Sequence, residues 1–229
     1  MKQFLLRAYK LYAKILFRKL TAQEAMQLIY RKGWWGRPNK SNFYSGRGSH
    51  DLHIIEPYID FMNNFIKLND ISIIVDLGCG DFNIGSRIFQ NVKKYIACDI
   101  VPELIHFNKN KYVYNSVVFC NIDAIKDKLP KGEVLMVRQV FQHLTNQEIQ
   151  AILDKVYDFK YLIVTEGLPK YDFEPNKDHF HGPDIRLSKK SGVVVHEYPF
   201  NFKYKSMNEV LRISDPKDSA SIVTTIYEL

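Results

Sequence analysis

Short apolar runs alternate with amphipathic stretches through the middle of this 229-residue chain. The runs are continuous, as in strands that are buried on both faces, and the stretches between them have helical spacing. Strands are expected at Ile71–Leu77, Tyr95–Asp99, Ser116–Cys120, Val134–Val137 and Tyr161–Thr165, and helices at about 53–68, 84–92, 102–110 and 146–157. This order predicts an α/β fold: a doubly wound, Rossmann-like, mostly parallel sheet with helices on both faces.

The N-terminal part of the chain has a different pattern. Residues 3–30 place apolar side chains on one helical face and basic side chains on another, which predicts a basic amphipathic helix. Such a helix either lies on an acidic membrane surface or a partner, or packs on the domain with its basic face in solvent. The Gly- and aromatic-rich segment 33–50 follows and is suited to covering a ligand or to clamping the helix to the core. We expect residues 1–52 to form a cap and residues 53–229 to form the main domain.

Regular periodicity stops after Glu166. Residues 168–192 contain three prolines and the run Asp178-His179-Phe180-His181. So long a segment at the carboxyl end of a strand is expected to be a lid or binding loop. Beyond it, Val193–Val195 and Ser221–Tyr227 predict the strands of a C-terminal antiparallel edge hairpin, with a short helix near 206–212 between them.

Charge and cysteine usage narrow the functional class. The formal net charge is +7, and residues 1–20 supply +6 of it, which leaves +1 for residues 21–229. A nearly neutral body weighs against nucleic acid as the main partner. The cysteines Cys79, Cys98 and Cys120 have neither a zinc spacing nor a paired arrangement, so buried reduced thiols in a cytoplasmic protein are expected. The apolar runs are too short for a transmembrane helix.

The turn Gly78-Cys79-Gly80 follows a strand and predicts a nucleotide site, because glycine lets the backbone approach a ligand closely. A dinucleotide site and an S-adenosylmethionine site are the alternatives. Asn83 stands where the dinucleotide fingerprint has its third glycine. Asp76 would face a pyrophosphate unfavourably but suits the methionine amino group. Asp99, at the end of the next strand, suits ribose hydroxyls in either case.

The run Val75-Asp76-Leu77-Gly78-Cys79-Gly80 resembles the first motif of the class I S-adenosylmethionine-dependent methyltransferases. Asp99, beside Ile100, is similar to that family's ribose-binding acid. The resemblance implies that Ile122-Asp123-Ala124 contacts the adenine and that Arg138-Gln139, in the family's fourth motif, lies beside the transferred methyl group. The upstream segment 43–50 resembles small bacterial methyltransferases from surface-polysaccharide loci, which implies that Tyr44, Arg47 or Ser49 lies near the methionine carboxylate.

The sequence departs from the family pattern at two places. Phe82 stands near the family's third glycine, and the fourth motif lacks the Asn/Asp-Pro-Pro-Tyr/Phe tetrapeptide of enzymes that methylate exocyclic amines of bases. The second departure favours a small-molecule or glycan acceptor. We expect an S-adenosylmethionine-dependent methyltransferase that methylates a hydroxyl of a saccharide, a sugar-linked phosphoryl group or a small metabolite. An RNA or protein methyltransferase, and an inactive binding or scaffold protein of the same fold, are the alternatives.

A hydroxyl acceptor must lose a proton, and histidine is the usual base near neutral pH. His143 is the first candidate because it follows the fourth strand, although a packing role is an equal alternative. His179 and His181 in the expected lid are weaker candidates, and a metal site there is not expected. Glu166 is a candidate acceptor contact, and Arg186, Lys189 and Lys190 are candidate contacts to an anionic substrate group.

Overall fold

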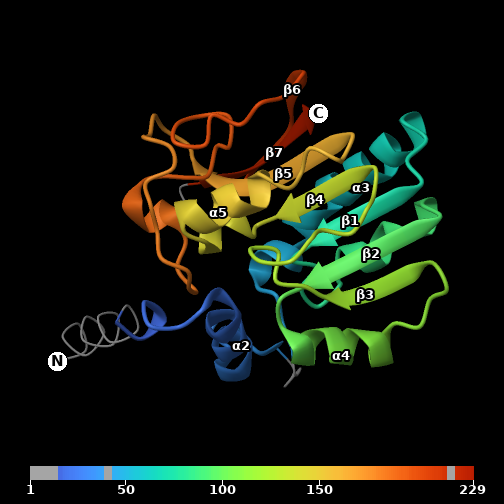
Figure 1. The fold of residues 1–229 in the computed structure, drawn as a ribbon, viewed down its shortest axis with the longest axis horizontal. Coiled ribbons are helices and arrows are strands. Elements are labelled where there is room, and N and C mark those ends of the chain that lie inside the picture. The colour runs from blue at the N-terminus through green and yellow to red at the C-terminus, as the bar shows by residue number, and fades with distance from the viewer. Residues whose placement is uncertain (1–14, 39–42, 216–219) are drawn as a thin grey trace.

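The computed structural model describes residues 15–38, 43–215 and 220–229, which form seven strands of one sheet and the helices around it (Figure 1). The strand order is β3-β2-β1-β4-β5-β7-β6. The strands are β1 (Ile73–Leu77), β2 (Lys94–Asp99), β3 (Val117–Asn121), β4 (Val134–Arg138), β5 (Tyr161–Pro169), β6 (Ser206–Ser214) and β7 (Ala220–Glu228). Strands β1 to β5 are parallel, and β7 runs antiparallel to both β5 and β6. The predicted α/β architecture with a C-terminal antiparallel hairpin is confirmed.

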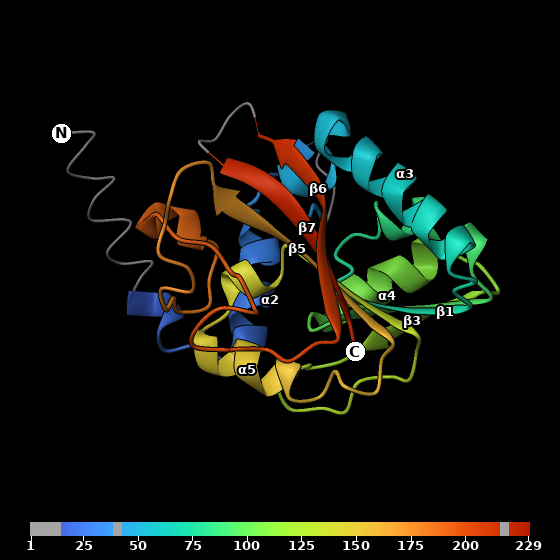
Figure 2. The same ribbon diagram turned by 90° about the horizontal axis from the view of Figure 1, so that it is seen from above.

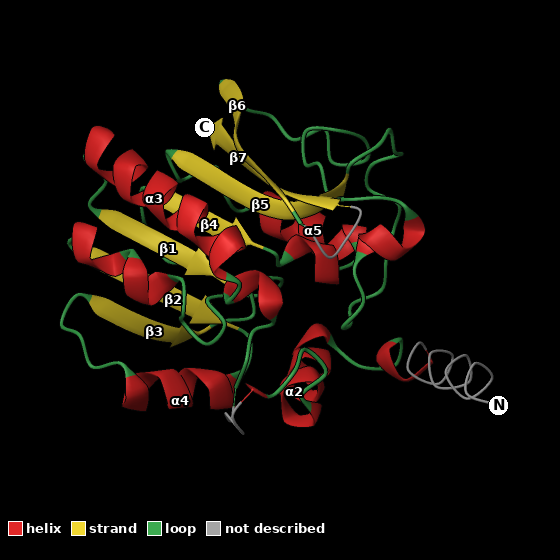
Figure 3. Cartoon of the chain, turned by 180° about the vertical axis from the view of Figure 1, so that it is seen from behind, coloured by secondary structure: helices red, strands yellow, loops and turns green. Residues whose placement is uncertain are grey.

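The helices are α2 (Ala22–Lys32), α3 (Leu52–Leu68), α4 (Pro102–Lys111) and α5 (Asn146–Leu153). Helices α3 and α5 lie on opposite sides of the sheet (Figures 2 and 3). Alternate residues of each strand serve the two faces: Ile74 and Met136 pack with α3, whereas Leu135 and Val137 pack with α5. Both faces are therefore buried, which explains the continuous apolar runs in the sequence.

Local sequence signals set the ends of two helices that flank the functional region. Thr21 and Glu24 form a reciprocal capping box at the start of α2, and Thr145 and Glu148 form another at the start of α5. Helix α2 ends at Gly33, which adopts a left-handed conformation with φ of 65°.

The predicted helix over residues 3–30 is interrupted. Residues 15–17 are helical, residues 18–20 turn, and α2 begins anew after Thr21. The capping box explains the break, because the Thr21 side chain takes the backbone N–H that a continuous helix would use. Residues 3–14 of the predicted helix lie outside the described residues. Among the residues that are described, no helix is both long and apolar enough to cross a bilayer.

The helix predicted at 84–92 is wrong. This stretch forms two 3-10 turns, η3 (Gly85–Arg87) and η4 (Phe89–Asn91). Phe82 adopts a φ of 63° and buries its ring fully, so the chain changes direction before a regular helix can begin.

Two predictions near the C-terminus are also wrong. Val193–Val195 is a buried loop, and the helix predicted near 206–212 is strand β6, the true hairpin partner of β7. A β-bulge between Glu209 and Leu211 shifts the register of β6. The extra residue places Met207, Val210 and Leu211 at helix-like spacing, which hides the strand period of two. The predicted lid, residues 168–192, consists of the end of β5 and an irregular segment with the short turn η6 (Arg186–Lys189), and the irregular chain continues to residue 205.

Candidate functional site

A cavity of about 430 Å³ opens at the carboxyl ends of the parallel strands. Its floor comes from β1, β2, β4 and β5 and from the start of β7, and its roof comes from α2, segment 43–50 and the 183–187 part of the lid. The roof segments lie beyond the arrowheads of β1 to β4 (Figure 1). The volume is in the range of small-ligand and cofactor sites. The following predicted residues line it: Gly78, Cys79, Gly80, Asp99, Ile100, Ile122, Ala124, Arg138, Gln139, Arg47, Ser49 and His143.

The turn after β1 is held by one carbonyl group and packed on both sides. The backbone N–H groups of Gly78 and Cys79 both donate to Cys98 O, at 2.8 and 2.9 Å. Gly78 has a φ of 76°, and a Cβ there would collide with Val140. Gly80 has a φ of 56°, and a Cβ there would collide with Ser45. Both positions therefore require glycine for conformation and for space.

Asp99 lies at the end of β2 with its carboxylate in the cavity wall. The carboxylate accepts hydrogen bonds from Gly80 N at 3.1 Å and from Val101 N at 3.0 Å. Burial raises the pKa of Asp99 to about 6, against the effect of these N–H donors. The residue thus joins the glycine turn to the start of α4 and presents a carboxylate to a ligand.

Asp76 does not line the cavity, so its predicted place beside a bound amino group is wrong. The residue precedes Leu77 on β1 and therefore faces the opposite side of the sheet. Its carboxylate accepts a hydrogen bond of 2.8 Å from the Tyr95 hydroxyl. Burial raises the pKa of Asp76 to about 7.

The segment after β3 contributes only its apolar members. Ile122 and Ala124 line the cavity, whereas Asp123 turns away, pairs with Lys126 at 2.8 Å and accepts from Ile125 N at 3.1 Å. Asp123 does not line the cavity, so its predicted contact with the adenine is not supported by its position.

Segment 43–50 lies over the glycine turn. The Ser45 hydroxyl accepts from Asp81 N at 2.7 Å and lies 3.0 Å from the Tyr30 hydroxyl of α2. Arg47 pairs with Asp51 at 3.4 Å and with Asp215. Tyr44 stacks on His50 with ring centroids 4.4 Å apart and does not line the cavity, contrary to its predicted place near a ligand.

Arg138, at the end of β4, is a buried cation that lines the cavity. Arg138 donates from Nη2 to Gly48 O at 2.7 Å and lies over the Tyr58 ring. Its Nε is buried and has no hydrogen-bond partner among the described residues. The next residue, Gln139, has a φ of 56°, a strained conformation for a side-chain-bearing residue, and its N–H donates to Thr165 O at 2.7 Å.

His143 lies in the turn η5 (Phe141–His143) and is 8% exposed. Its Nδ1 lies 3.0 Å from Gly182 O, and its Nε2 lies 3.4 Å from the Gln142 amide nitrogen. The indole of Trp35 packs against the imidazole with ring centroids 5.1 Å apart. Burial lowers the pKa of His143 to about 4, so the ring is neutral near physiological pH.

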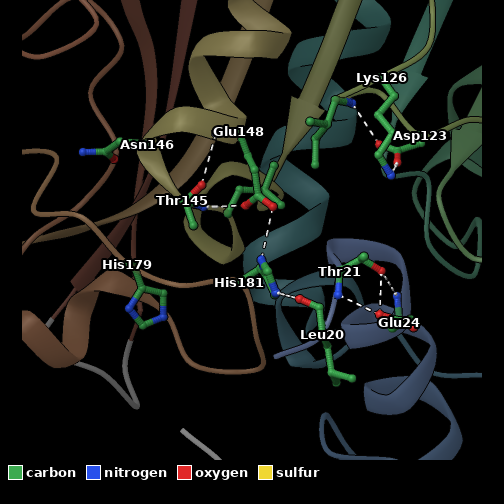
Figure 4. A network of polar contacts seen from close by, with 12 residues as sticks. Leu20, Thr21, Glu24, Asp123, Lys126, Thr145, Asn146, Glu148, His179 and His181 are labelled. Carbon is green, nitrogen blue, oxygen red and sulfur yellow. Dashed lines mark hydrogen bonds and ion pairs between the residues drawn. The ribbon is translucent and has the colours of Figure 1, made fainter. Parts of the chain in front are cut away.

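The two lid histidines lie outside the cavity, so their predicted role as bases is not supported by their positions. His179 Nε2 donates to Asp184 O at 3.2 Å. His181 connects three segments: Nδ1 lies 3.1 Å from Glu148 Oε1 and Nε2 lies 2.5 Å from Leu20 O (Figure 4). The described part of the chain contains no group of three or more His, Cys, Asp or Glu side chains placed to hold a metal ion.

Two other candidates prove to be internal supports. Glu166 is buried and accepts from Phe141 N at 2.9 Å and Gln142 N at 3.2 Å, and burial raises its pKa to about 8. Arg186 is 1% exposed and donates to Lys177 O and Leu144 O at 2.5 and 2.6 Å. Both side chains hold the loops of the site in place and do not face a ligand.

Several residues that line the cavity were not predicted from the sequence, among them Ala22, Met26, Val140, Gln142, Gly167, Ile185 and Ile222. They come from segments that only the folded chain brings together. Of these, Val140 and Gln142 had a local signal, since both lie in the stretch that resembles the fourth motif.

No protein-family model and no curated protein sequence matches the chain. Solved structures do match. The N-methyltransferase NodS from Bradyrhizobium japonicum WM9, in complex with S-adenosylhomocysteine, is 11% identical with a TM-score of 0.59 and covers 80% of this chain and 90% of its own.

Two further matches were solved with S-adenosylmethionine bound. The magnesium protoporphyrin IX methyltransferase ChlM from Synechocystis PCC 6803, with bound S-adenosylmethionine, is 13% identical with a TM-score of 0.57 and covers 91% of this chain and 98% of its own. Human N-acetylserotonin methyltransferase, in complex with S-adenosylmethionine, is 14% identical with a TM-score of 0.56 and covers 92% of this chain and 61% of its own. The chain has the fold of the class I S-adenosylmethionine-dependent methyltransferases.

Proposed function

We propose that the protein is an S-adenosylmethionine-dependent methyltransferase with a small-molecule acceptor. One observation carries the proposal: the two constrained glycines, the buried carboxylate of Asp99 and the apolar side chains of Ile122 and Ala124 all face one cavity. A nucleoside needs this combination, in which a carboxylate binds hydroxyls and apolar side chains hold a base.

The residues present fit the cofactor. Asp99 would accept hydrogen bonds from the ribose hydroxyls, and Ile100, Ile122 and Ala124 would pack on the adenine. The turn at Gly78 and Gly80 would lie against the methionine part. Arg138, with its unpartnered buried Nε, would meet the methionine carboxylate, and Arg47 and Ser49 line the same wall. When bound, the cofactor supplies a methyl group on a positively charged sulfur.

The chain's own part in the reaction is to position the acceptor and to remove its proton. Gly182 O accepts only, so the neutral His143 carries its proton on Nδ1 and keeps a lone pair on Nε2. The Nε2 lone pair, which the Gln142 NH₂ group faces at 3.4 Å, is the position that would take the proton of an acceptor hydroxyl once the acceptor replaces that long contact. The roof formed by α2, segment 43–50 and the lid would limit the access of water and help to position the acceptor.

Among the predicted acceptors, the cavity favours a small metabolite over a saccharide or a sugar-linked phosphoryl group. The wall toward the lid is formed by Pro183, Asp184, Ile185 and Leu187 and offers few polar side chains, whereas a saccharide needs many buried polar partners. Two of the three cations predicted to contact an anionic substrate group bind the protein itself: Arg186 as described above, and Lys189 through Asp178 O at 2.6 Å. For Lys190 the contact remains a prediction.

We keep a cytoplasmic location with peripheral membrane contact through residues 1–20 as a prediction, although residues 1–14 lie outside the described residues. Phe17 is buried, and Leu20 O accepts from His181, so a deletion should stop at residue 14 to spare the fold. Removal of residues 1–14 should shift the protein from the membrane to the supernatant in cell fractionation. An unchanged distribution would contradict membrane contact.

The decisive experiment is calorimetric titration with S-adenosylmethionine and S-adenosylhomocysteine, with NAD as the control ligand. We expect both sulfur compounds to bind and NAD not to bind. The matched variant is Gly80→Ala, whose new Cβ would collide with the Ser45 hydroxyl and distort the turn. Absence of binding by both sulfur compounds would instead support a binding or scaffold protein with this fold.

A further inference from the structure

The cavity has two halves, which the strand order separates. One half lies at the carboxyl ends of β1, β2 and β3 and contains the glycine turn and Asp99. The half beyond β4 lies on β5 and β7 and under the lid. Its wall contains the apolar residues Gly167, Pro183, Ile185, Leu187, Ala220 and Ile222, together with Asp184 and with Asp215, whose carboxylate pairs with Arg47. A ligand held by the glycine turn leaves this second half for another molecule.

One polar atom in the second half stands out. Gln142 is 7% exposed, its backbone N–H donates to Glu166 Oε2 at 3.2 Å, and its side chain lines the cavity. The amide oxygen Oε1 is buried and has no hydrogen-bond partner among the described residues. A buried carbonyl without a donor is costly, so such an oxygen in a cavity wall points to a ligand that supplies one.

The orientation of this amide follows from its neighbours. Gly182 O can only accept, so His143 must donate from Nδ1, which leaves a lone pair on Nε2. The Nε2 atom lies 3.4 Å from the Gln142 side chain, which must therefore present its NH₂ group to the ring. The opposite orientation would bring two acceptors together. Oε1 is thus the atom of Gln142 that remains for a ligand.

Gly167 lies beside Oε1 and has no side chain to cover it. A Cβ at this position would lie 3.4 Å from Gln142 Oε1 and 3.5 Å from Leu187 Cδ1, which are ordinary contacts. An alanine could therefore be accommodated, and it would cover the amide oxygen.

We propose that Gln142 Oε1 accepts a hydrogen bond from a hydroxyl or N–H group of the methyl acceptor, and that the rest of the acceptor is an apolar body held by the lid-side wall. This inference rests on the proposed methyltransferase function, of which it names the substrate class. Gln142 is a specificity-determining residue in this arrangement. An acceptor analogue without the donor would leave Oε1 buried and unpaired, and the site would reject it.

The test uses phenol and anisole, which differ by the methyl group that removes the donor. Binding of each is measured by saturation-transfer NMR titration, with and without saturating S-adenosylhomocysteine. We expect the parent protein to prefer phenol by about 10-fold or more. In Gln142→Met, which keeps the side-chain length and the backbone bond to Glu166, the preference should fall to about 2-fold or less. The matched control Gln147→Met, at an exposed position of α5, should keep the parent preference.

Gly167→Ala provides a second variant that leaves Gln142 in place. Its methyl group fits in ordinary contact and covers Oε1, so the phenol preference should also be lost while the unfolding temperature stays near the parent value. Equal binding of phenol and anisole by the parent, no binding of phenol, or a preference retained in Gln142→Met would each overturn the inference.

The two proposals fail in different ways. The second half of the cavity is formed by the chain itself, so the phenol preference is expected in both the free and the S-adenosylhomocysteine-saturated protein. A protein that does not bind S-adenosylhomocysteine yet prefers phenol would contradict the proposed cofactor and support the role of Gln142. A protein that binds S-adenosylhomocysteine without a phenol preference would support the proposed cofactor and contradict the role of Gln142.

Discussion

The surroundings of His143 set the tautomer of the imidazole and at the same time lower its pKa. The contact with Gly182 O sets the tautomer in which Nε2 carries the lone pair, while burial lowers the pKa of the ring to about 4. The imidazole is therefore deprotonated across the physiological range, and its geometry rather than its basicity suits it to receive a proton.

We expect His143→Ala to lower turnover about 100-fold or more, because the proton acceptor is removed. Cofactor affinity should change little, since the imidazole lies on the β4 side of the cavity, away from Asp99. Steady-state kinetics and calorimetry on the same preparation check both parts. Turnover equal to that of the parent would remove His143 as the base.

His143 also predicts that the stability of the fold decreases in acid. His143 has a pKa of about 4 in the folded protein and an ordinary value of 6.5, so between these values the unfolded chain binds a proton that the folded chain does not. Stability should therefore fall as the pH decreases from 6.5 to 4, by up to about 3 kcal/mol from this residue. Urea unfolding across this range measures the fall, and His143→Leu should reduce it. An identical pH dependence in the variant would refute the assignment.

A substitution of Asp99 tests whether the cofactor binds in the half of the cavity that contains the glycine turn. Asp99→Asn preserves the size of the side chain but removes the charge, and it should weaken S-adenosylhomocysteine binding by about 1–3 kcal/mol. Calorimetry measures the change, and Asp123→Asn is the matched control because Asp123 does not line the cavity. Equal affinity in Asp99→Asn and the parent would place the ribose elsewhere.

At the scale of elements, Phe82 explains why the glycine turn after β1 is not followed by a helix. With a φ of 63° it occupies a conformation that glycine favours, and its fully buried ring lies 4.8 to 5.6 Å from the rings of Phe119, Tyr112 and Tyr95. A Cβ at Gly85 would collide with the Phe82 ring. Gly85 therefore does not replace the missing glycine of the turn but makes room for the phenyl group.

This packing predicts a coupling between the two positions. Gly85→Ala should destabilise the protein by about 1–3 kcal/mol through overpacking. In the Phe82→Leu background the same change should cost less, because the smaller side chain leaves space. Chemical unfolding of the two single variants and the double variant gives the coupling energy. Additive effects would show that the ring and Gly85 do not share this space.

The elements also show what the sequence could predict and what it could not. Strands β1 to β5 and the glycine turn were predictable because buried parallel strands are continuous apolar runs and the turn needs glycine. Strand β6 was not, because its bulge disguises the strand period. Asp76 was misplaced because the motif gives residue types, whereas the face of the strand decides where a side chain points. Gln142 and Gly167 meet only through the pairing of β4 with β5, which no local pattern reveals.

At the scale of the whole molecule, His181 links segments from three parts of the chain: the lid, the start of α5 and the residue before Thr21. Both of its partners, Glu148 Oε1 and Leu20 O, are acceptors, so both ring nitrogens donate only when the imidazole is protonated. The hydrogen bond to Glu148 raises the pKa of His181 above its ordinary 6.5, against the smaller effect of burial.

The sign of this shift gives a pH prediction. A raised pKa means that the link stabilises the fold fully below pH 6.5 and loses its effect as the pH rises through the folded-state pKa. The difference in unfolding free energy between the parent and His181→Ala should therefore be largest in mild acid and shrink in alkali. His106→Ala, at an exposed position of α4, is the control. A difference that is constant with pH would mean that the imidazole is not charged in the fold.

The order β5-β7-β6 has a consequence for how the chain assembles during synthesis. β6 leaves the ribosome before β7, yet its neighbour in the sheet is β7 alone, and β7 also covers the edge of β5. Until β7 has been made, β5 presents a row of unpaired N–H and C=O groups, and β6 has no strand beside it. A nascent chain paused between these two strands therefore carries an open edge that invites pairing with other chains, and this is the stage at which a chaperone would have most to protect.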